Sequence, residues 1–158
     1  MPTNKVSATM SATDLQDVLT AITTIGTKMP FMISLTPDER KGLLRFGDKS
    51  LAFVTKALEL ATQKTDILPR NFDVNEFKKD VDLYNQLYSI TQPLSLMLEK
   101  LDDTQKEVGS EAYSAALIVY QSAKMSGSDL GGLESVLDDL GKRFSRKTAS
   151  ATVNGNPS

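Results

Sequence analysis

The sequence predicts an all-α fold: an antiparallel up-and-down four-helix bundle with a fifth, short C-terminal helix. Two observations favour this class. Apolar residues recur at intervals of three and four over long stretches, which is the period of an amphipathic helix. The 6 prolines and 9 glycines among 158 residues gather at a few points, where helices can end. Short connections between such helices favour antiparallel neighbours.

The same pattern predicts the domain organisation. Residues 1–11 are small and polar, and we expect them to form a flexible N-terminal tail. Residues 12–145 are expected to form a single helical-bundle domain, which is long enough to bury a core. Residues 146–158 are polar and predict a disordered C-terminal tail.

The first helix is expected to begin at Thr13, because Gln16 lies three residues later and the pair can form a capping box. Pro30 ends it, since proline cannot continue a helix. The apolar residues between these two points share one helical face: Leu15, Val18, Leu19, Ile22, Ile25 and Met29.

The second helix is predicted to run unbroken from Thr36 to Thr65. Thr36 can cap it, Pro37 suits its first position, and Glu39 completes a capping box. Its apolar arc spans roughly 200°, wider than a surface helix with two neighbours needs. Gly47 is expected on the buried face, where another helix can approach closely. The segment is therefore either the shared wall of the bundle or a wall between subunits.

The third helix is predicted from Val74 to Leu101, capped by Asp73 with Glu76. Its apolar stripe keeps its phase across Pro93, which predicts a kinked helix and not two helices. A corner is expected at residues 101–104.

The fourth helix then runs from about Asp103 to Met125 and is the least polar. The fifth carries apolar residues in heptad spacing between Leu130 and Phe144, and Gly131 with Gly132 weakens its first turn. A basic cluster lies at the C-terminal end of this helix, where positive charge interacts favourably with the helix dipole. It consists of Lys142, Arg143, Arg146 and Lys147.

Composition excludes several kinds of chemistry. The chain has no cysteine and no histidine. Disulfides, thiolate nucleophiles, Ser-His-Asp triads and the commonest transition-metal ligands are therefore excluded, and we expect no cofactor, no metal site and no enzyme activity. The net charge of −2 gives no electrostatic case for binding nucleic acid or an anionic membrane. The sequence also shows neither a secretory signal nor an apolar run long enough to span a membrane, so a cytoplasmic location is expected.

The candidate site residues are aromatic side chains and one carboxylate. Tyr84 and Tyr88 lie one turn apart, Tyr113 and Tyr120 lie two turns apart, and antiparallel third and fourth helices would bring all four together. Such a cluster forms either a ligand slot with phenol donors or, more simply, core filler with hydroxyls at its rim. Glu111 lies toward the apolar side and would need a partner if buried. The full candidate set, as a ligand or interface face, is Phe46, Phe53, Tyr84, Tyr88, Glu111, Tyr113 and Tyr120.

Three short stretches and one further tyrosine carry a resemblance: Leu35–Arg40, Gly47–Val54, Val108–Tyr113 and Tyr120. With them, the chain between roughly residues 14 and 145 resembles a family of small bacterial helical proteins of about this length, to which no activity is assigned. The resemblance implies a bacterial, cytoplasmic, helical protein and transfers no functional residue.

Three hypotheses for function remain. The first is a non-enzymatic interaction or scaffold protein that self-associates or binds another helical protein, because the apolar arcs are wide and no catalytic constellation occurs. The second is a binding protein for a small apolar ligand held between the third and fourth helices. The third is an enzyme that uses only Tyr, Asp, Glu, Lys or Ser.

Overall fold

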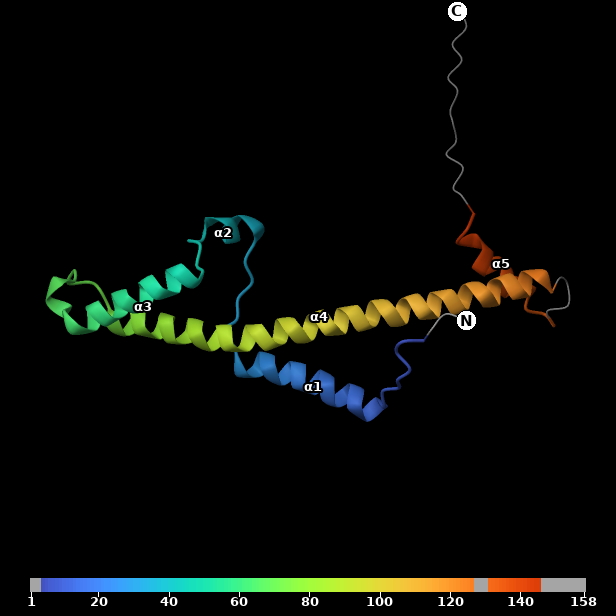
Figure 1. Ribbon diagram of the computed structural model, residues 1–158, viewed down its shortest axis with the longest axis horizontal. Coiled ribbons are helices and arrows are strands. Elements are labelled where there is room, and N and C mark those ends of the chain that lie inside the picture. Colours follow the sequence, from blue (N-terminus) through green and yellow to red (C-terminus); the bar gives the residue numbers. More distant parts are fainter. Residues whose placement is uncertain (1–3, 127–130, 146–158) are drawn as a thin grey trace, which may run out of the picture. The chain divides into compact units, whose positions relative to one another are not determined.

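The computed structural model describes residues 4–126 and 131–145, and in this part of the chain the regular structure is entirely helical. The elements are α1 (Ala12–Lys28), α2 (Pro37–Gly42), α3 (Asp48–Gln63), the 3-10 turn η1 (Thr65–Ile67), α4 (Val74–Met125) and α5 (Glu134–Lys142). The all-α prediction is confirmed. Figure 1 shows the order of these elements along the chain. Within the described residues, no helix combines the length and the apolar character that a membrane crossing requires.

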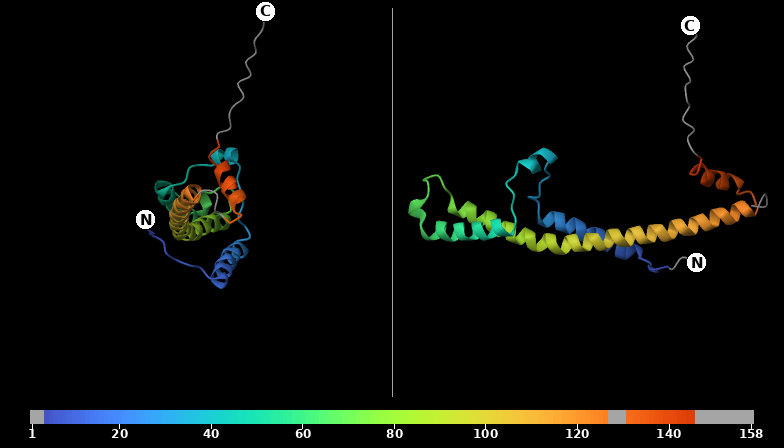
Figure 2. Two further views of the ribbon diagram at one scale, coloured as in Figure 1. Left: turned by 90° about the vertical axis from the view of Figure 1, so that its right-hand side faces the viewer. Right: turned by 45° about the horizontal axis from the view of Figure 1, so that its top comes forward.

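The described residues form two compact units: residues 8–101, and residues 102–126 and 131–145 together with residues 4–7. In the first unit, α3 and the N-terminal part of α4 form an antiparallel hairpin through η1 (Figures 1 and 2). Phe46, just before α3, contacts Tyr84 of α4, with ring centroids 4.4 Å apart. In the second unit, α5 lies against the C-terminal part of α4, where Tyr120 and Phe144 stack at 5.4 Å.

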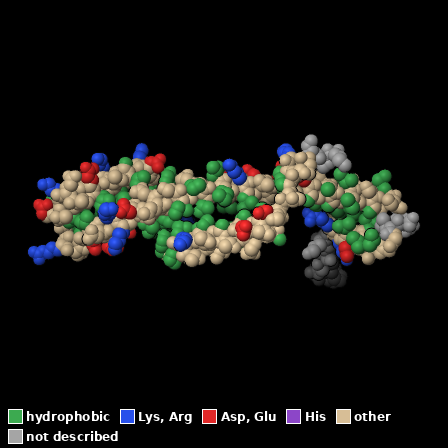
Figure 3. Space-filling model, turned by 90° about the horizontal axis from the view of Figure 1, so that it is seen from below, with side chains coloured by type: hydrophobic (Ala, Val, Ile, Leu, Met, Phe, Trp, Pro, Cys, Tyr) green, Lys and Arg blue, Asp and Glu red, His purple; other side chains and the backbone are tan. Residues whose placement is uncertain are grey.

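Burial is sparse in both units. Among the described residues only Ala61 of α3 and Val81 of α4 are buried. Large apolar side chains remain exposed on every long helix, and they reach the surface on the face drawn in Figure 3. α1 buries none of its residues, although its apolar stripe follows the predicted spacing. The hydrophobic faces are therefore present, but most of their area is not covered within one chain.

The predicted helix from Thr36 to Thr65 is two helices. The capping box is confirmed, since Thr36 Oγ1 accepts from the Glu39 backbone and Glu39 Oε2 accepts from the Thr36 backbone. The helix that it starts, however, ends at Gly42, where Leu43 is extended (φ −71°, ψ 146°). Gly47 lies just before the second helix as its N-cap and is not on a buried helical face. Glycine disfavours a helix interior by about 1 kcal/mol, and it suits this extended position.

The predicted corner at residues 101–104 is absent, because α4 runs through it without interruption. Acidic residues at positions 102 and 103 resemble a helix start, but neither glycine nor proline follows to break the preceding helix. Asp102 instead pairs with Lys106 one turn later (2.5 Å), an arrangement that supports a continuous helix. Pro93 lies inside α4, as the unbroken stripe predicts.

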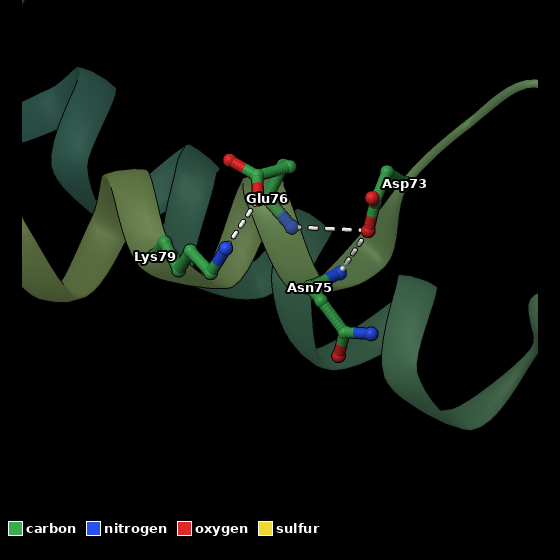
Figure 4. A network of polar contacts seen from close by, with 4 residues as sticks. All are labelled: Asp73, Asn75, Glu76 and Lys79. Atoms are coloured by element: carbon green, nitrogen blue, oxygen red, sulfur yellow. Dashed lines mark hydrogen bonds and ion pairs between the residues drawn. The ribbon is translucent and has the colours of Figure 1, made fainter.

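The start of α4 is a polar network of four residues (Figure 4). The Asp73 carboxylate accepts hydrogen bonds from the backbone N–H groups of Asn75 (2.8 Å) and Glu76 (3.1 Å), so the predicted cap is confirmed. The Glu76 side chain pairs with Lys79, and this hydrogen bond raises the pKa of the lysine above its ordinary value. The network therefore fixes the first turn of α4.

The outer helices differ from the sequence prediction in their ends. α1 is capped by Ser11, which accepts from the backbone N–H of Asp14 (3.0 Å), and not by Thr13. α5 is shorter than predicted and begins at Glu134. Gly131 and Gly132 precede it with φ of 58° and 91°, values that glycine adopts without strain and that keep these residues out of the helix. Leu130 and the predicted C-terminal tail at 146–158 lie outside the described residues.

Candidate functional site

The candidate residues fall into three local groups. The third and fourth predicted helices are one helix, so the four tyrosines follow one another along α4 and do not face each other across two helices. Phe46 joins Tyr84 and Tyr88. Tyr113 and Tyr120 contact Arg143 and Phe144, which directly follow α5. Glu111 contacts the N-terminal segment, and Phe53 is 74% exposed.

The first group is an aromatic row in the α3–α4 hairpin. The rings of Phe46 and Tyr84 meet at 4.4 Å and 60°, and those of Tyr84 and Tyr88 lie 6.3 Å apart at 29°. The spacing of Tyr84 and Tyr88 by four residues puts both rings on one face of α4. Beside them is an open hollow of about 290 Å³ between the two helices. Its lining is mainly apolar: Phe46, Leu51, Val54, Phe77, Asp80, Val81 and Tyr84.

The second group lies where the C-terminal end of α5 packs against α4. The Arg143 guanidinium lies 5.0 Å above the Tyr113 ring, and its Nε donates a hydrogen bond to the Tyr113 hydroxyl (3.3 Å). Two turns further along α4, the Tyr120 ring stacks on the Phe144 ring with an interplanar angle of 27°. A Cβ built at Gly141 would come within 3.3 Å of the Tyr120 hydroxyl, so the absence of a side chain there lets the two helices approach. Both tyrosines therefore contact residues at the C-terminal end of α5, and the Tyr113 hydroxyl accepts one hydrogen bond there.

The third group is centred on Glu111. Its Oε1 accepts hydrogen bonds from the backbone N–H groups of Lys5 (2.5 Å) and Val6 (3.4 Å). With its side-chain amide turned so that the nitrogen faces the carboxylate, Asn4 donates to Glu111 as well. One turn earlier on α4, Glu107 pairs with the Lys5 ammonium at 3.4 Å. The half-buried carboxylate that the sequence singled out therefore holds backbone groups of the predicted tail.

An open, apolar hollow adjoins Glu111 on α4. Its volume is about 560 Å³, and Val6 of the N-terminal segment forms part of its wall. The remaining lining residues are Asn4, Val108, Glu111, Ala112, Ala115, Ile118 and Val119. The small side chains of Ala112 and Ala115 and the Glu111 carboxylate both border the hollow. This arrangement suits an extended segment that offers N–H donors and one apolar side chain.

Three contact residues were not among the sequence candidates. Phe144 and Arg143 appeared there only as a heptad member and as part of a basic cluster, and Lys5 lay in the predicted tail. The heptad spacing of Leu137 and Phe144 could have indicated a packing face for α5, but the sequence did not indicate which face of α4 it contacts. Nothing in the local sequence of Lys5 pointed to a partner more than 100 residues away.

Several acidic side chains lie on the helix surfaces. Two aspartates form ion pairs on exposed helix surfaces: Asp102 with Lys106 and Asp139 with Lys142. Asp80 borders the hollow in the hairpin but is itself exposed. In residues 4–126 and 131–145, no three acidic side chains gather where they could hold a metal ion.

Comparisons with protein-family models, with curated proteins and with solved structures found no significant match to this chain.

Proposed function

We propose that this chain is a non-enzymatic helical interaction or scaffold protein that self-associates. One observation carries the proposal: in the described residues only Ala61 and Val81 are buried, while large apolar side chains on α1, α3 and α4 are exposed. Two buried side chains of this size supply far less than the order of 10² kcal/mol of burial that a domain sets against its conformational entropy. Contact with a second copy would remove the exposed apolar surface from water.

A continuous apolar stripe on α4 is the face on which we place this association. It comprises Leu94, Met97, Leu98 and Leu101, which follow the i, i+3, i+4, i+7 pattern of a helix contact. Met97, Leu98 and Leu101 are 63%, 66% and 63% exposed. Such a stripe is typical of helices that pack against another helix.

The sequence predicted an antiparallel four-helix bundle within one chain, and we propose that a four-helix arrangement forms between two copies. One α3–α4 hairpin supplies two helices, so two hairpins from two copies supply four. The exposed Phe53 and Leu60 on α3 would then lie within reach of the partner. We also propose that the chain belongs to the bacterial family that its sequence runs resemble and that it is cytoplasmic. Another helical protein is the alternative partner.

Sedimentation velocity over a wide concentration range tests the proposal, with Leu98→Lys as the disrupting variant. A charge buried at an apolar contact is costly, so the variant should weaken self-association by at least about tenfold. Gln86→Lys, which adds the same charge to an exposed polar position of α4, serves as the matched control and should leave association unchanged. A wild-type chain that stays monomeric at the highest concentration contradicts the proposal. Equal effects of the two substitutions contradict the assigned face.

The second candidate function is binding of a small apolar ligand, and the hollow in the α3–α4 hairpin favours it. Its volume of about 290 Å³ is close to the lower limit for ligand pockets, and aromatic rings with one phenol line it. Native mass spectrometry of freshly purified protein should then show a bound small molecule that Val54→Trp abolishes. A mass equal to that of the bare chain in every preparation contradicts this candidate.

A further inference from the structure

We propose that the N-terminal segment of one copy, Asn4–Val6, docks on α4 of a second copy at Glu107 and Glu111. The proposal rests on the self-association proposed above and names a contact that contributes to it. We call the two carboxylates and the adjoining hollow the N-segment site. Everything that defines the site lies within one unit of the chain.

The site recognises three successive features of an extended segment. Glu111 accepts the Lys5 N–H at 2.5 Å and the Val6 N–H at 3.4 Å, and it also receives the Asn4 amide. Glu107 receives the Lys5 ammonium at 3.4 Å. Val6 enters the wall of the apolar hollow. The ligand chemistry is therefore a polar, basic, apolar tripeptide with free backbone N–H groups.

The spacing of Glu107 and Glu111 lets both carboxylates contact the same segment. Residues four apart on a helix lie on one face, so Glu107 and Glu111 point to the same side of α4. One carboxylate binds the side-chain charge while the other binds the backbone, which fixes both the position and the register of the segment. Charge-assisted hydrogen bonds of this kind are stronger than bonds between neutral groups.

The segment is suited to exchange between copies. Its hydrogen bonds and its ion pair are made with α4 residues more than 100 positions away in the chain. Residues 7–10, between the segment and the cap of α1, have neither helix nor strand. The same donors and acceptors can meet when the segment comes from another copy, as in the exchange of identical elements between protomers.

A charge-swap experiment distinguishes exchange between copies from contact within one chain. Lys5→Glu and Glu107→Lys each create a like-charge pair, and each should weaken self-association by about threefold, the scale of an exposed ion pair. When the two variants are mixed, a mixed dimer contains one native Lys5–Glu107 pair and one pair in which the two opposite charges have changed places. The mixture should therefore regain wild-type association, and mixed dimers should exceed their statistical share. Native mass spectrometry with one variant labelled with ¹⁵N separates the mixed species by mass.

Two further variants complete the test. Glu111→Ala removes the acceptor of both backbone bonds and should weaken self-association by about tenfold or more, with unchanged helix content by circular dichroism. Asp138→Lys makes the same change of charge as Glu107→Lys on exposed α5 and should have no effect. Wild-type association that none of the three site substitutions changes overturns this inference and leaves the proposed function standing. Weakened variants that do not recover on mixing also overturn it, because the contact then forms within one chain.

Discussion

The capping box formed by Thr36 and Glu39 fixes the start of α2 through three hydrogen bonds. Thr36 Oγ1 accepts from the Glu39 N–H at 3.3 Å, and Glu39 Oε2 accepts from the Thr36 N–H at 2.8 Å and from its hydroxyl at 2.9 Å. The bond from the Thr36 backbone, and then that from its side chain, hold the pKa of Glu39 below its ordinary value of 4.5. The ionised carboxylate is therefore the form that stabilises the helix start.

We expect Thr36→Ala to raise the pKa of Glu39 toward its ordinary value and to weaken the start of α2 by about 1 kcal/mol. The sign follows from linkage: a carboxyl with a lowered folded-state pKa contributes its stabilisation above its unfolded-state pKa, and loses it as the pH falls through the folded-state pKa. The wild-type helix start should thus weaken below pH 4.5, and the variant should show less of this dependence. A carbon-detected NMR titration of Glu39 measures it.

Ser34→Ala is the matched control for that prediction, because it removes a hydroxyl two residues upstream of the cap. It should leave the titration of Glu39 unchanged. If Thr36→Ala also leaves it unchanged, the capping box does not control the carboxyl.

Signals confined to a few residues were predictable from the sequence. The caps at Thr36 and Asp73 depend on residue types at fixed short spacing, and the side chain acts on a backbone group two or three residues away. The cap of α1 was placed at Thr13 because several hydroxyl and carboxyl residues are adjacent there, and Ser11 with Asp14 satisfies the same chemistry. Motif spacing alone does not select between such neighbours.

At the scale of elements, the notable feature of α4 is Pro93, which lies inside the helix without ending it. Pro93 has no N–H to donate to the carbonyl of Ser89, so one hydrogen bond of the ladder is missing. The apolar stripe continues on both sides, and the Ser89 hydroxyl bonds back to the Asn85 carbonyl (2.9 Å) just before the gap. The helix is therefore weakest in the turn that contains residues 89–93.

We expect Pro93→Ala to stabilise α4, by an amount on the order of 3 kcal/mol, because it restores the missing hydrogen bond and removes a steric clash. Amide hydrogen exchange should slow for the residues around position 93. Pro37→Ala is the control, since Pro37 stands at the first position of α2, where the N–H has no intrahelical partner. Equal effects of the two substitutions would show that the gap in α4 is not a weak point.

The errors at this scale have a common physical cause. The break at residues 43–47 and the continuity through residues 101–104 both depend on small differences in helix propensity. Gly42 and Gly47 end and cap helices in the structure, whereas the acidic pair at 102 and 103 joins a helical ion pair. A capping motif states where a helix can begin, but packing and neighbouring turns decide whether it does.

For the whole molecule, the central fact is the small number of buried side chains in the described residues. Stability that comes from contacts between copies depends on concentration by mass action. The melting temperature of the wild-type chain should therefore rise by several degrees over a hundredfold increase in protein concentration. Differential scanning calorimetry measures this rise, and the Leu98→Lys variant should lack most of it. A melting temperature that is constant over this range would mean that one chain is stable alone.

The candidate site was predicted only in part. Tyr84 and Tyr88 stack on one another, as their spacing on one helical face suggests, but the other partners are Phe46, Arg143, Phe144 and Lys5. Residue type and helical face pointed to these side chains, but Phe53 of the same candidate set is 74% exposed. Their partners depend on where the chain turns. Because α4 continues through residues 101–104, Tyr84 and Tyr88 do not face Tyr113 and Tyr120 across two helices.

The uninterrupted course of α4 has a consequence for the kinetics of folding. Its backbone hydrogen bonds join residues only four positions apart, so no distant segment has to arrive before the helix forms. Helix formation of this kind relaxes in about 0.1–1 μs for short peptides, whereas subunit assembly takes milliseconds to minutes. Refolding should therefore show a fast rise of helical signal at a rate independent of concentration. The self-association proposed above adds a slower bimolecular phase in which the apolar surfaces become covered.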